Sequence, residues 1–225
     1  MGIHVVAMLT HNDQTVRDAF EVFKANQGAK TKCWGFKDIG IRMDEAVELV
    51  ARMKEAGKIT FLEPLREDEE SCLLTARMAV ECRFDYVIGM VGSRAVREIL
   101  QKNGIRYMPT CGRRSGLPRM LYGTHEEIIR DGAALVQDGA DGLCLSSYRY
   151  ADGDPEALTR EFLRKIHAPL IISGGINTFS RLDFVKRVRP WGFTIGSALF
   201  AHQFGDGKSV AEQLDIIQDY IDAQH

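Results

Sequence analysis

The sequence predicts a compact TIM (β/α)8 barrel that forms a single domain of residues 1–225. Three observations lead to this prediction: short apolar runs alternate with amphipathic segments along the chain, the runs number eight, and each run is continuously hydrophobic. Continuous hydrophobicity is typical of parallel strands that are covered on both faces. The alternative, a doubly wound open sheet, usually has fewer strands and a glycine-rich turn after the first strand, where MLTHNDQT has no glycine.

The expected strands and helices follow one another in order. The strands occupy residues 3–10, 31–36, 59–65, 85–91, 105–110, 142–147, 169–173 and 192–196. In the helix expected over 43–56, apolar residues recur at the spacing of one helical face. Thr124 and Glu127 form a capping box at the start of another helix, and Asp154-Pro155 is typical of a helix N-terminus.

Composition excludes several classes of protein. Hydrophobic residues make up 45% of the 225 residues, enough for one sizeable core, and the net charge of −2 provides no general attraction for nucleic acids or membranes. The five cysteines include no C-x-x-C pair, which argues against a disulfide framework or a zinc site. No apolar run approaches the roughly 18 residues of a membrane span. We therefore expect a cytoplasmic protein without nucleic-acid or membrane partners, whose outer helices could pair two copies as a homodimer.

Two small-residue turns follow the last two expected strands. Ser173-Gly174-Gly175 ends the seventh strand, and Gly196-Ser197 ends the eighth. In a TIM barrel the loops at these two positions often bind phosphate. Glycine lets backbone N–H groups approach an oxyanion closely, and the amides of a short helix formed by SALF would favour an anion. The order and position of the turns therefore predict a phosphate site.

The same two turns carry a resemblance to a known group of barrels. SGGI and IGSALF resemble the C-terminal quarter of the ribulose-phosphate-binding barrels, which include the histidine-biosynthesis isomerase, phosphoribosylanthranilate isomerase, ribulose-phosphate epimerase and the keto-deoxy-phosphogluconate aldolases. The resemblance covers roughly residues 169–200 and implies a barrel that binds a small phosphorylated metabolite. FMN-binding barrels have a similar pair of turns, so the phosphate could belong to a flavin, although this short chain leaves little to cover one. We expect no other cofactor and no metal.

A third turn, Gly92-Ser93, follows the fourth expected strand and could bind a second phosphate. In the two-fold symmetric barrels of this group the third strand contributes a Gly-Gly turn to such a site. Here the third strand ends in FLEPL, so an ordinary helix N-terminus is the favoured interpretation.

Lys37 and Glu63 are the main candidates for the reaction. Lys37 shares strand parity with Cys33 and Gly35, whose small side chains leave space for it inside the barrel. A desolvated lysine could form a Schiff base, with Glu63 transferring protons beside it. A structural ion pair between Lys37 and Glu63 on neighbouring strands explains the presence of these two residues equally well. Asp38 could be an alternative acid or base, or could cap the next turn.

Other polar residues at strand ends are open to two interpretations each. His11 is the only histidine at a predicted catalytic end, and it could equally be an ordinary loop residue. Arg149 could hold a substrate carboxylate or a second phosphate, or lie exposed in its loop. Arg113 and its neighbours in CGRRSGLPRM could form a mobile anion-binding lid. Cys111 lies close to these arginines without an identifiable base, so we expect it to be inert.

The known reactions of the group cannot be transferred to this chain residue by residue. The sixth strand, GLCLSSYRY, lacks the lysine of the phosphogluconate-type aldolases, and the histidines cannot supply the metal ligands of the epimerase. The leading hypothesis is an enzyme that isomerises or cleaves a small phosphorylated sugar or keto acid. A non-catalytic sensor of phosphorylated metabolites is the first alternative, and an FMN-dependent oxidoreductase is the second.

Overall fold

Eight parallel strands form a closed barrel in the computed structural model, which describes residues 2–116 and 118–223. The strands are β1 (His4–Met8), β4 (Cys33–Lys37), β5 (Ile59–Glu63), β6 (Tyr86–Ile88), β7 (Arg106–Met108), β10 (Leu143–Leu145), β11 (Leu170–Ile172) and β12 (Gly192–Ile195). They pair in the order β10-β11-β12-β1-β4-β5-β6-β7. A parallel bridge between Thr110 and Cys144 joins the two ends, where the Cys111 N–H donates to the Cys144 carbonyl at 3.0 Å. The predicted TIM barrel is confirmed, with every barrel strand in its expected segment except that β4 extends one residue further, to Lys37.

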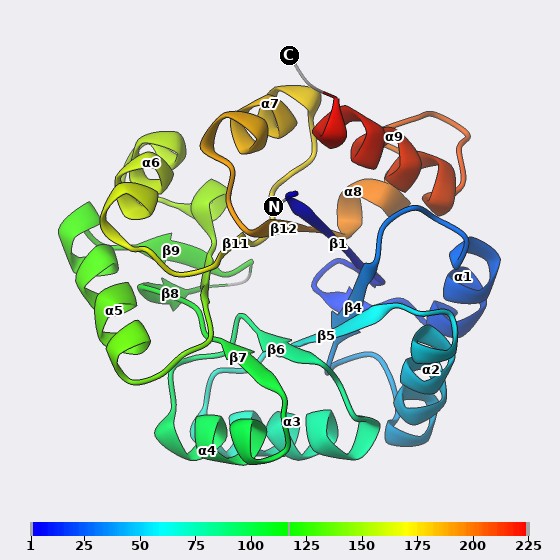
Figure 1. The fold of residues 1–225 in the computed structure, drawn as a ribbon, viewed down its shortest axis with the longest axis horizontal. Coiled ribbons are helices and arrows are strands. Elements are labelled where there is room, and N and C mark those ends of the chain that lie inside the picture. The colour runs from blue at the N-terminus through cyan, green and yellow to red at the C-terminus, as the bar shows by residue number, and fades with distance from the viewer. Residues whose placement is uncertain (1, 117, 224–225) are drawn as a thin grey trace.

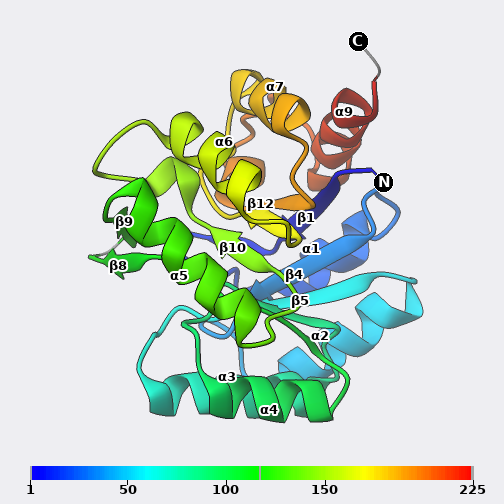
Figure 2. The ribbon, with the colours of Figure 1, turned by 60° about the vertical axis from the view of Figure 1, so that its left-hand side comes forward.

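Helices surround the strands as a ring (Figure 1). They are α1 (Ala19–Asn26), α2 (Met43–Glu55), α3 (Glu69–Cys82), α4 (Arg94–Lys102), α5 (His125–Gln137), α6 (Pro155–Lys165), α7 (Phe179–Val188) and α9 (Val210–Asp222). The short α8 (Ser197–Phe200) follows β12 directly and lies inside the ring, against α9. Figure 2 shows the helices packed along the outside of the strands. Among the described residues, no helix is both long enough and apolar enough to cross a membrane.

The helix signals in the sequence are confirmed. The apolar face of α2 is fully buried at Ala46, Leu49, Val50 and Met53. Thr124 and Glu127 form both hydrogen bonds of a capping box at the start of α5. Asp154 caps α6 through the Glu156 amide, with proline at the first helical position.

Strand parity decides which side chains enter the barrel. A buried layer inside the barrel takes residues from seven strands: Val6, Met8, Cys33, Phe61, Ile88, Met108, Cys144 and Ile171. Side chains two positions further along a strand point to the same side, at the next level toward its carboxyl end. Parity therefore puts Thr10, Lys37, Glu63, Ser146 and Ser173 above this layer.

Two hairpins extend from the carboxyl ends of the strands, and the sequence-based prediction missed both. The strand expected over 3–10 ends at Met8, and β2 (Thr10–His11) turns back into β3 (Gln14–Thr15). The segment after the fifth barrel strand, expected as a loop, contains β8 (Arg113–Ser115) and β9 (Met120–Tyr122), which pair as a hairpin. Both hairpins bring charged residues over the open end of the barrel.

Candidate active site

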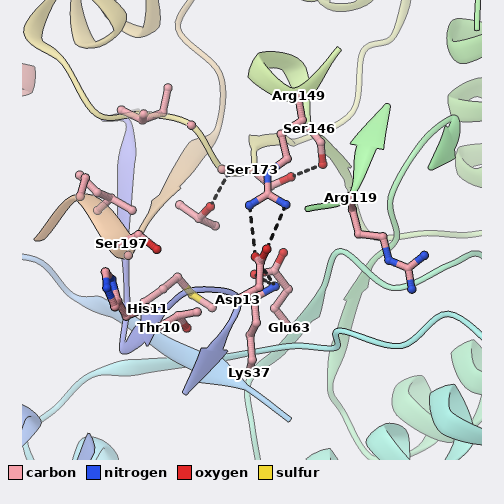
Figure 3. Close-up of a pocket in the computed structure, with 18 of the residues that line it drawn as sticks. Thr10, His11, Asp13, Lys37, Glu63, Arg119, Ser146, Arg149, Ser173 and Ser197 are labelled. Atoms are coloured by element: carbon pink, nitrogen blue, oxygen red, sulfur yellow. Dashed lines mark hydrogen bonds and ion pairs between the residues drawn. The ribbon is translucent and has the colours of Figure 1, made fainter. Parts of the chain in front are cut away.

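A cavity of about 260 Å³ lies at the carboxyl ends of the barrel strands (Figure 3). Residues from the β2–β3 hairpin, β4, β5, the β8–β9 hairpin and the loops after β10, β11 and β12 line it. Ligands of TIM barrels bind at this face. The cavity has two chemically different sides, which we call the glycine side and the charged side.

The glycine side consists of the two small-residue turns found in the sequence. Gly174 and Gly175 both have positive φ, 72° and 76°, and a Cβ on Gly175 would lie 2.6 Å from the Cβ of Tyr148. The Gly174 N–H donates to the Thr194 hydroxyl at 3.0 Å, which fixes the turn next to β12. Gly196 approaches the Thr10 carbonyl so closely that a Cβ there would be 2.9 Å from it. Both turns line the cavity, and both have backbone conformations or contacts that favour glycine.

α8 starts at Ser197, directly after the second turn, as the SALF segment predicts. The first amides of a helix have no acceptor within the helix, so those of α8 can donate to a bound anion. Ser197 itself lines the cavity. The residues of the two predicted turns, Ser173, Gly174, Gly175, Gly196 and Ser197, therefore all line the same cavity.

Thr10 and His11 add two side chains to this wall. The Thr10 side chain is buried (the residue is 6% exposed), and its Oγ1 has no hydrogen-bond partner among the described residues. The same is true of the buried Nδ1 of His11. The β2 strand contacts α8, and Figure 3 shows His11 next to Ser197. Because buried polar atoms normally have partners, these two are candidates to bind a ligand. His11, predicted as a catalytic residue, thus lies on the glycine side.

The charged side is centred on Lys37, whose side chain is 10% exposed. Its Nζ lies 3.5 Å from Glu63 Oε2 and 3.6 Å from Asp13 Oδ1. Lys37 and Glu63 are paired neighbours in the β4–β5 register, which explains why the sequence places them together. Gly35 lets β4 lie close to β5, since a Cβ there would lie 2.4 Å from the Phe61 carbonyl oxygen.

Asp13 is the central residue that the sequence-based prediction missed. It lies at the tip of the β2–β3 hairpin, where Asn12 and Asp13 have φ of 50° and 60°, typical of a tight hairpin turn. Its carboxylate also pairs with Arg149 Nη2 at 3.1 Å, and so it links Lys37 to the loop after β10. The dipeptide Asn-Asp is a turn signal that could have identified the hairpin.

The charges around Asp13 keep it ionised. Burial alone would raise the pKa of Asp13, but the positive charges of Lys37 and Arg149 and their hydrogen bonds outweigh this effect. The pKa of Asp13 is therefore below its ordinary value of 3.8. At neutral pH the carboxylate holds Lys37 and Arg149 in place.

Two serine hydroxyls lie between the two sides of the cavity. Ser146 Oγ and Ser173 Oγ are hydrogen-bonded at 3.1 Å, and both residues are buried at the cavity wall. Figure 3 shows this pair next to the Arg149 side chain. A ligand that spans the cavity would pass these hydroxyls.

Two predicted residues lie away from the cavity lining. Asp38 accepts hydrogen bonds from the Leu65 amide and the Thr75 hydroxyl, so its carboxylate holds the loop before α3. Arg113 lies over the ring of Tyr122, at 5.2 Å, and lines a second hollow of about 720 Å³. Its neighbour Arg114 enters the cavity instead.

The remaining candidates have structural surroundings. Ser93 caps α4 by accepting from the Val96 amide, and its own N–H donates to the Tyr107 hydroxyl. Ser93 thus makes the helix-capping contact favoured from the sequence, and Gly92 lines the second hollow. Cys111 is fully buried, which raises the pKa of its thiol well above the ordinary value. Among the described residues, no group of His, Cys, Asp and Glu side chains could hold a metal ion.

The fold and the cavity together define a class: a compact TIM barrel with two glycine turns that line a cavity at the ends of its last two strands. No protein-family model and no curated protein matches the sequence. Solved structures match over almost the whole chain, although with few identical residues.

Three of these structures illustrate the likeness. The N-(5'-phosphoribosyl)anthranilate isomerase of Pyrococcus furiosus has a TM-score of 0.66 and 17% identity over 96% of this chain and 99% of its own. The orotidine 5'-phosphate decarboxylase of Lactobacillus acidophilus has a TM-score of 0.69 and 10% identity over 99% and 100%. The tryptophan synthase alpha chain of Legionella pneumophila has a TM-score of 0.68 and 16% identity over 98% and 92%. These are ribulose-phosphate-binding barrels, the group that the two motifs resemble, and at this identity they show the fold of the chain alone.

Proposed function

We propose that the protein is an enzyme that acts on a small phosphorylated sugar or keto acid, as an isomerase or an aldolase-type lyase. One observation carries this proposal: a single cavity has two glycine turns and neutral hydroxyl groups on one side and a buried lysine–carboxylate cluster on the other. The structural neighbours include an isomerase and a decarboxylase whose names specify phosphorylated compounds, which supports a substrate of this kind.

The glycine side binds the phosphate in this proposal. Backbone amides of Gly175 and of the first turn of α8 donate to its oxygens, and the hydroxyls of Thr10 and Ser197 add to them. Binding there orients the rest of the substrate past Ser146 toward Lys37. Fixing the reacting carbon in this way contributes to the rate through proximity and orientation.

The charged side carries out the proton transfers. The Glu63 carboxylate removes a proton from the carbon next to the substrate carbonyl, and the Lys37 ammonium donates to the carbonyl oxygen as negative charge develops on it. To complete an isomerisation, Glu63 returns the proton to the former carbonyl carbon, while the hydroxyl on the adjacent carbon gives its proton back to the Lys37 amine and becomes the new carbonyl. The same pair could assist a retro-aldol cleavage by removing the proton of a hydroxyl group and stabilising the resulting enolate.

The surroundings of Lys37 favour a proton donor over a Schiff base. Lys37 Nζ is paired with two carboxylates within 3.6 Å, and attack on a substrate carbonyl would require it to leave both ion pairs. We therefore expect sodium borohydride to trap no covalent adduct at Lys37 in the presence of phosphorylated sugars and keto acids. Mass spectrometry of the treated protein checks this, and an adduct at Lys37 would favour the aldolase mechanism.

The cavity volume supports a small substrate over a flavin. A volume of about 260 Å³ lies below the usual range of about 300–1,000 Å³ for pockets that hold drug-sized ligands. A phosphorylated compound of three to six carbons is compatible with it. We propose that the reaction requires no FMN, and an unchanged flavin spectrum on mixing FMN with the protein is the expected result.

Proton exchange with solvent tests the proposed function directly. Candidate aldose, ketose and keto-acid phosphates are incubated with the protein in D2O and followed by proton NMR. We expect deuterium at the carbon next to the carbonyl, with exchange abolished in Glu63→Gln and retained in Glu48→Gln, an exposed residue of α2. Ligand-dependent thermal stabilisation without exchange or turnover would instead identify a non-catalytic sensor.

A further inference from the structure

The charged side of the cavity holds more positive than negative charge. Among the described residues, the cations that line it are Lys37, Arg114, Arg119 and Arg149. The carboxylates that contact these cations are Asp13, Glu63 and Glu67. One positive charge is therefore left in excess on this side, whereas the glycine side consists of neutral donors.

Arg114 and Arg119 share a single carboxylate. Glu67 lies 2.6 Å from Arg114 Nη2 through one oxygen and 3.3 Å from Arg119 Nη1 through the other. Arg114 Nη2 also donates to the Gly89 carbonyl at 2.8 Å, and the Arg114 side chain is only 9% exposed. These contacts fix both guanidinium groups at the cavity wall.

The two guanidinium groups still have unused donors. The Nε of Arg114 and the Nε of Arg119 are buried and have no hydrogen-bond partner among the described residues. A guanidinium carries five N–H donors, and leaving a buried donor unpaired costs free energy. An acceptor that enters the cavity would satisfy donors that the protein itself leaves unpaired.

The position of this pair specifies the kind of acceptor. In Figure 3, Arg119 lies across the Arg149 side chain from His11 and Ser197. A substrate with its phosphate on the glycine side would therefore present its other end to Arg119. Arginine binds a carboxylate through two parallel N–H groups, and one carboxylate carries the single negative charge that this side lacks.

We propose that Arg119 and Arg114 bind a carboxylate of the substrate, which is therefore a phosphorylated keto acid or sugar acid rather than an uncharged sugar phosphate. This inference rests on the proposed phosphate site and narrows its substrate class. Glu67 is a positioning residue that holds the two arginines and does not touch the substrate.

A matched pair of ligands tests the inference. 3-Phosphoglycerate and glycerol 3-phosphate share a three-carbon chain and a phosphate, and they differ in a carboxylate against a hydroxymethyl group. By titration calorimetry we expect 3-phosphoglycerate to bind at least about tenfold more tightly, which corresponds to one charge-assisted interaction. Arg119→Gln should remove this difference and leave the affinity for glycerol 3-phosphate unchanged. Arg119→Lys keeps the positive charge but loses the two parallel N–H donors of the guanidinium, so it should retain only part of the affinity difference between the two ligands.

Arg113→Gln is the control, because Arg113 belongs to the same hairpin but lies outside the cavity lining. It should leave both affinities as they are, which separates a specific contact from general attraction by the charge of the hairpin. Equal affinities for the two ligands in the unmodified protein would overturn the carboxylate site and leave the proposed function standing. If neither ligand binds, the phosphate site fails, and the inference fails with it.

Discussion

The two sides of the cavity are built in different ways. The glycine side comes mainly from neighbouring segments, the turns after β11 and β12 together with α8, and most of the groups that it presents belong to the backbone. The charged side is assembled from side chains that are far apart in the sequence, including Asp13, Lys37, Glu63 and Arg149. Backbone sites of the first kind leave a compact motif in the sequence, whereas sites of the second kind depend on tertiary packing. Their proposed functions differ as well: the glycine side binds the phosphate, and the charged side carries out the proton transfers.

The largest expected effect separates reaction from binding. Lys37→Gln removes the proton donor, so we expect solvent exchange at the substrate carbon to fall by about 10²- to 10⁴-fold. The affinity for glycerol 3-phosphate should stay within about twofold, because the phosphate binds on the other side. Proton NMR in D2O and titration calorimetry measure the two quantities. Lys102→Gln, at the exposed end of α4, is the matched control. Unchanged exchange in Lys37→Gln would leave the lysine a structural ion-pair residue.

A substitution on the glycine side should reduce ligand affinity rather than the rate of proton exchange. A Cβ on Gly175 would collide with Tyr148 at a φ of 76°, so Gly175→Ala should displace the amides that receive the phosphate. We expect at least a tenfold loss of affinity for glycerol 3-phosphate and a loss of about 1–3 kcal/mol in the free energy of unfolding. Gly28→Ala is the control, because a Cβ there meets nothing within 4 Å. Full affinity in Gly175→Ala would place the phosphate elsewhere.

Most of the fold could be predicted from the sequence, because continuous apolar runs and helix caps are local signals. The eight barrel strands and the caps at Thr124 and Asp154 follow from such signals. The two hairpins could not be predicted in the same way, because each strand in them has only two or three residues, too few to establish a hydrophobic period.

The candidate site also has parts that the sequence predicts and parts that depend on tertiary packing. The shared position of the two glycine turns and the neighbouring positions of Lys37 and Glu63 follow from motif order and strand parity. Asp13 lies on a missed hairpin, so its place beside Lys37 could not be seen, and the arginines of CGRRSGLPRM could be named only as a group. Asp38 and Arg113 lie at strand ends in the sequence. In the structure Asp38 contacts Thr75 and Arg113 contacts Tyr122, and neither side chain lines the cavity.

A pH-dependent effect tests how the charged side is held together. Because the pKa of Asp13 is lowered in the folded protein, its carboxylate stabilises the fold above its ordinary pKa of 3.8, and this stabilisation is lost as the pH falls through the lower folded value. At pH 7 we expect Asp13→Asn to have a lower Tm than the unmodified protein. The difference should narrow as the pH falls below about 3.8. Thermal unfolding of both proteins over this range checks the sign, and a gap that widens in acid would contradict the pairing.

The smallest expected effect comes from a substitution of Thr10 on the glycine side. Thr10→Val replaces a buried hydroxyl that has no partner among the described residues by an apolar group of the same shape. The free protein should therefore be as stable or slightly more stable, because an unpaired buried polar group is removed. Affinity for glycerol 3-phosphate should fall by about three- to tenfold, the effect of one hydrogen bond. Reduced stability with unchanged affinity would mean that Thr10 has a structural role only.

A crystal structure with 3-phosphoglycerate bound is the most direct test of the central claim, that one side of the cavity binds the phosphate and the other carries out the reaction. We predict that the phosphate lies between residues 173–177 and 195–198, within hydrogen-bond distance of the Gly175 and Ser197 amides. The carbon chain should then extend past Ser146 toward Lys37 and Glu63. A phosphate on Lys37 and Arg149, with no ligand at the two glycine turns, would contradict this account.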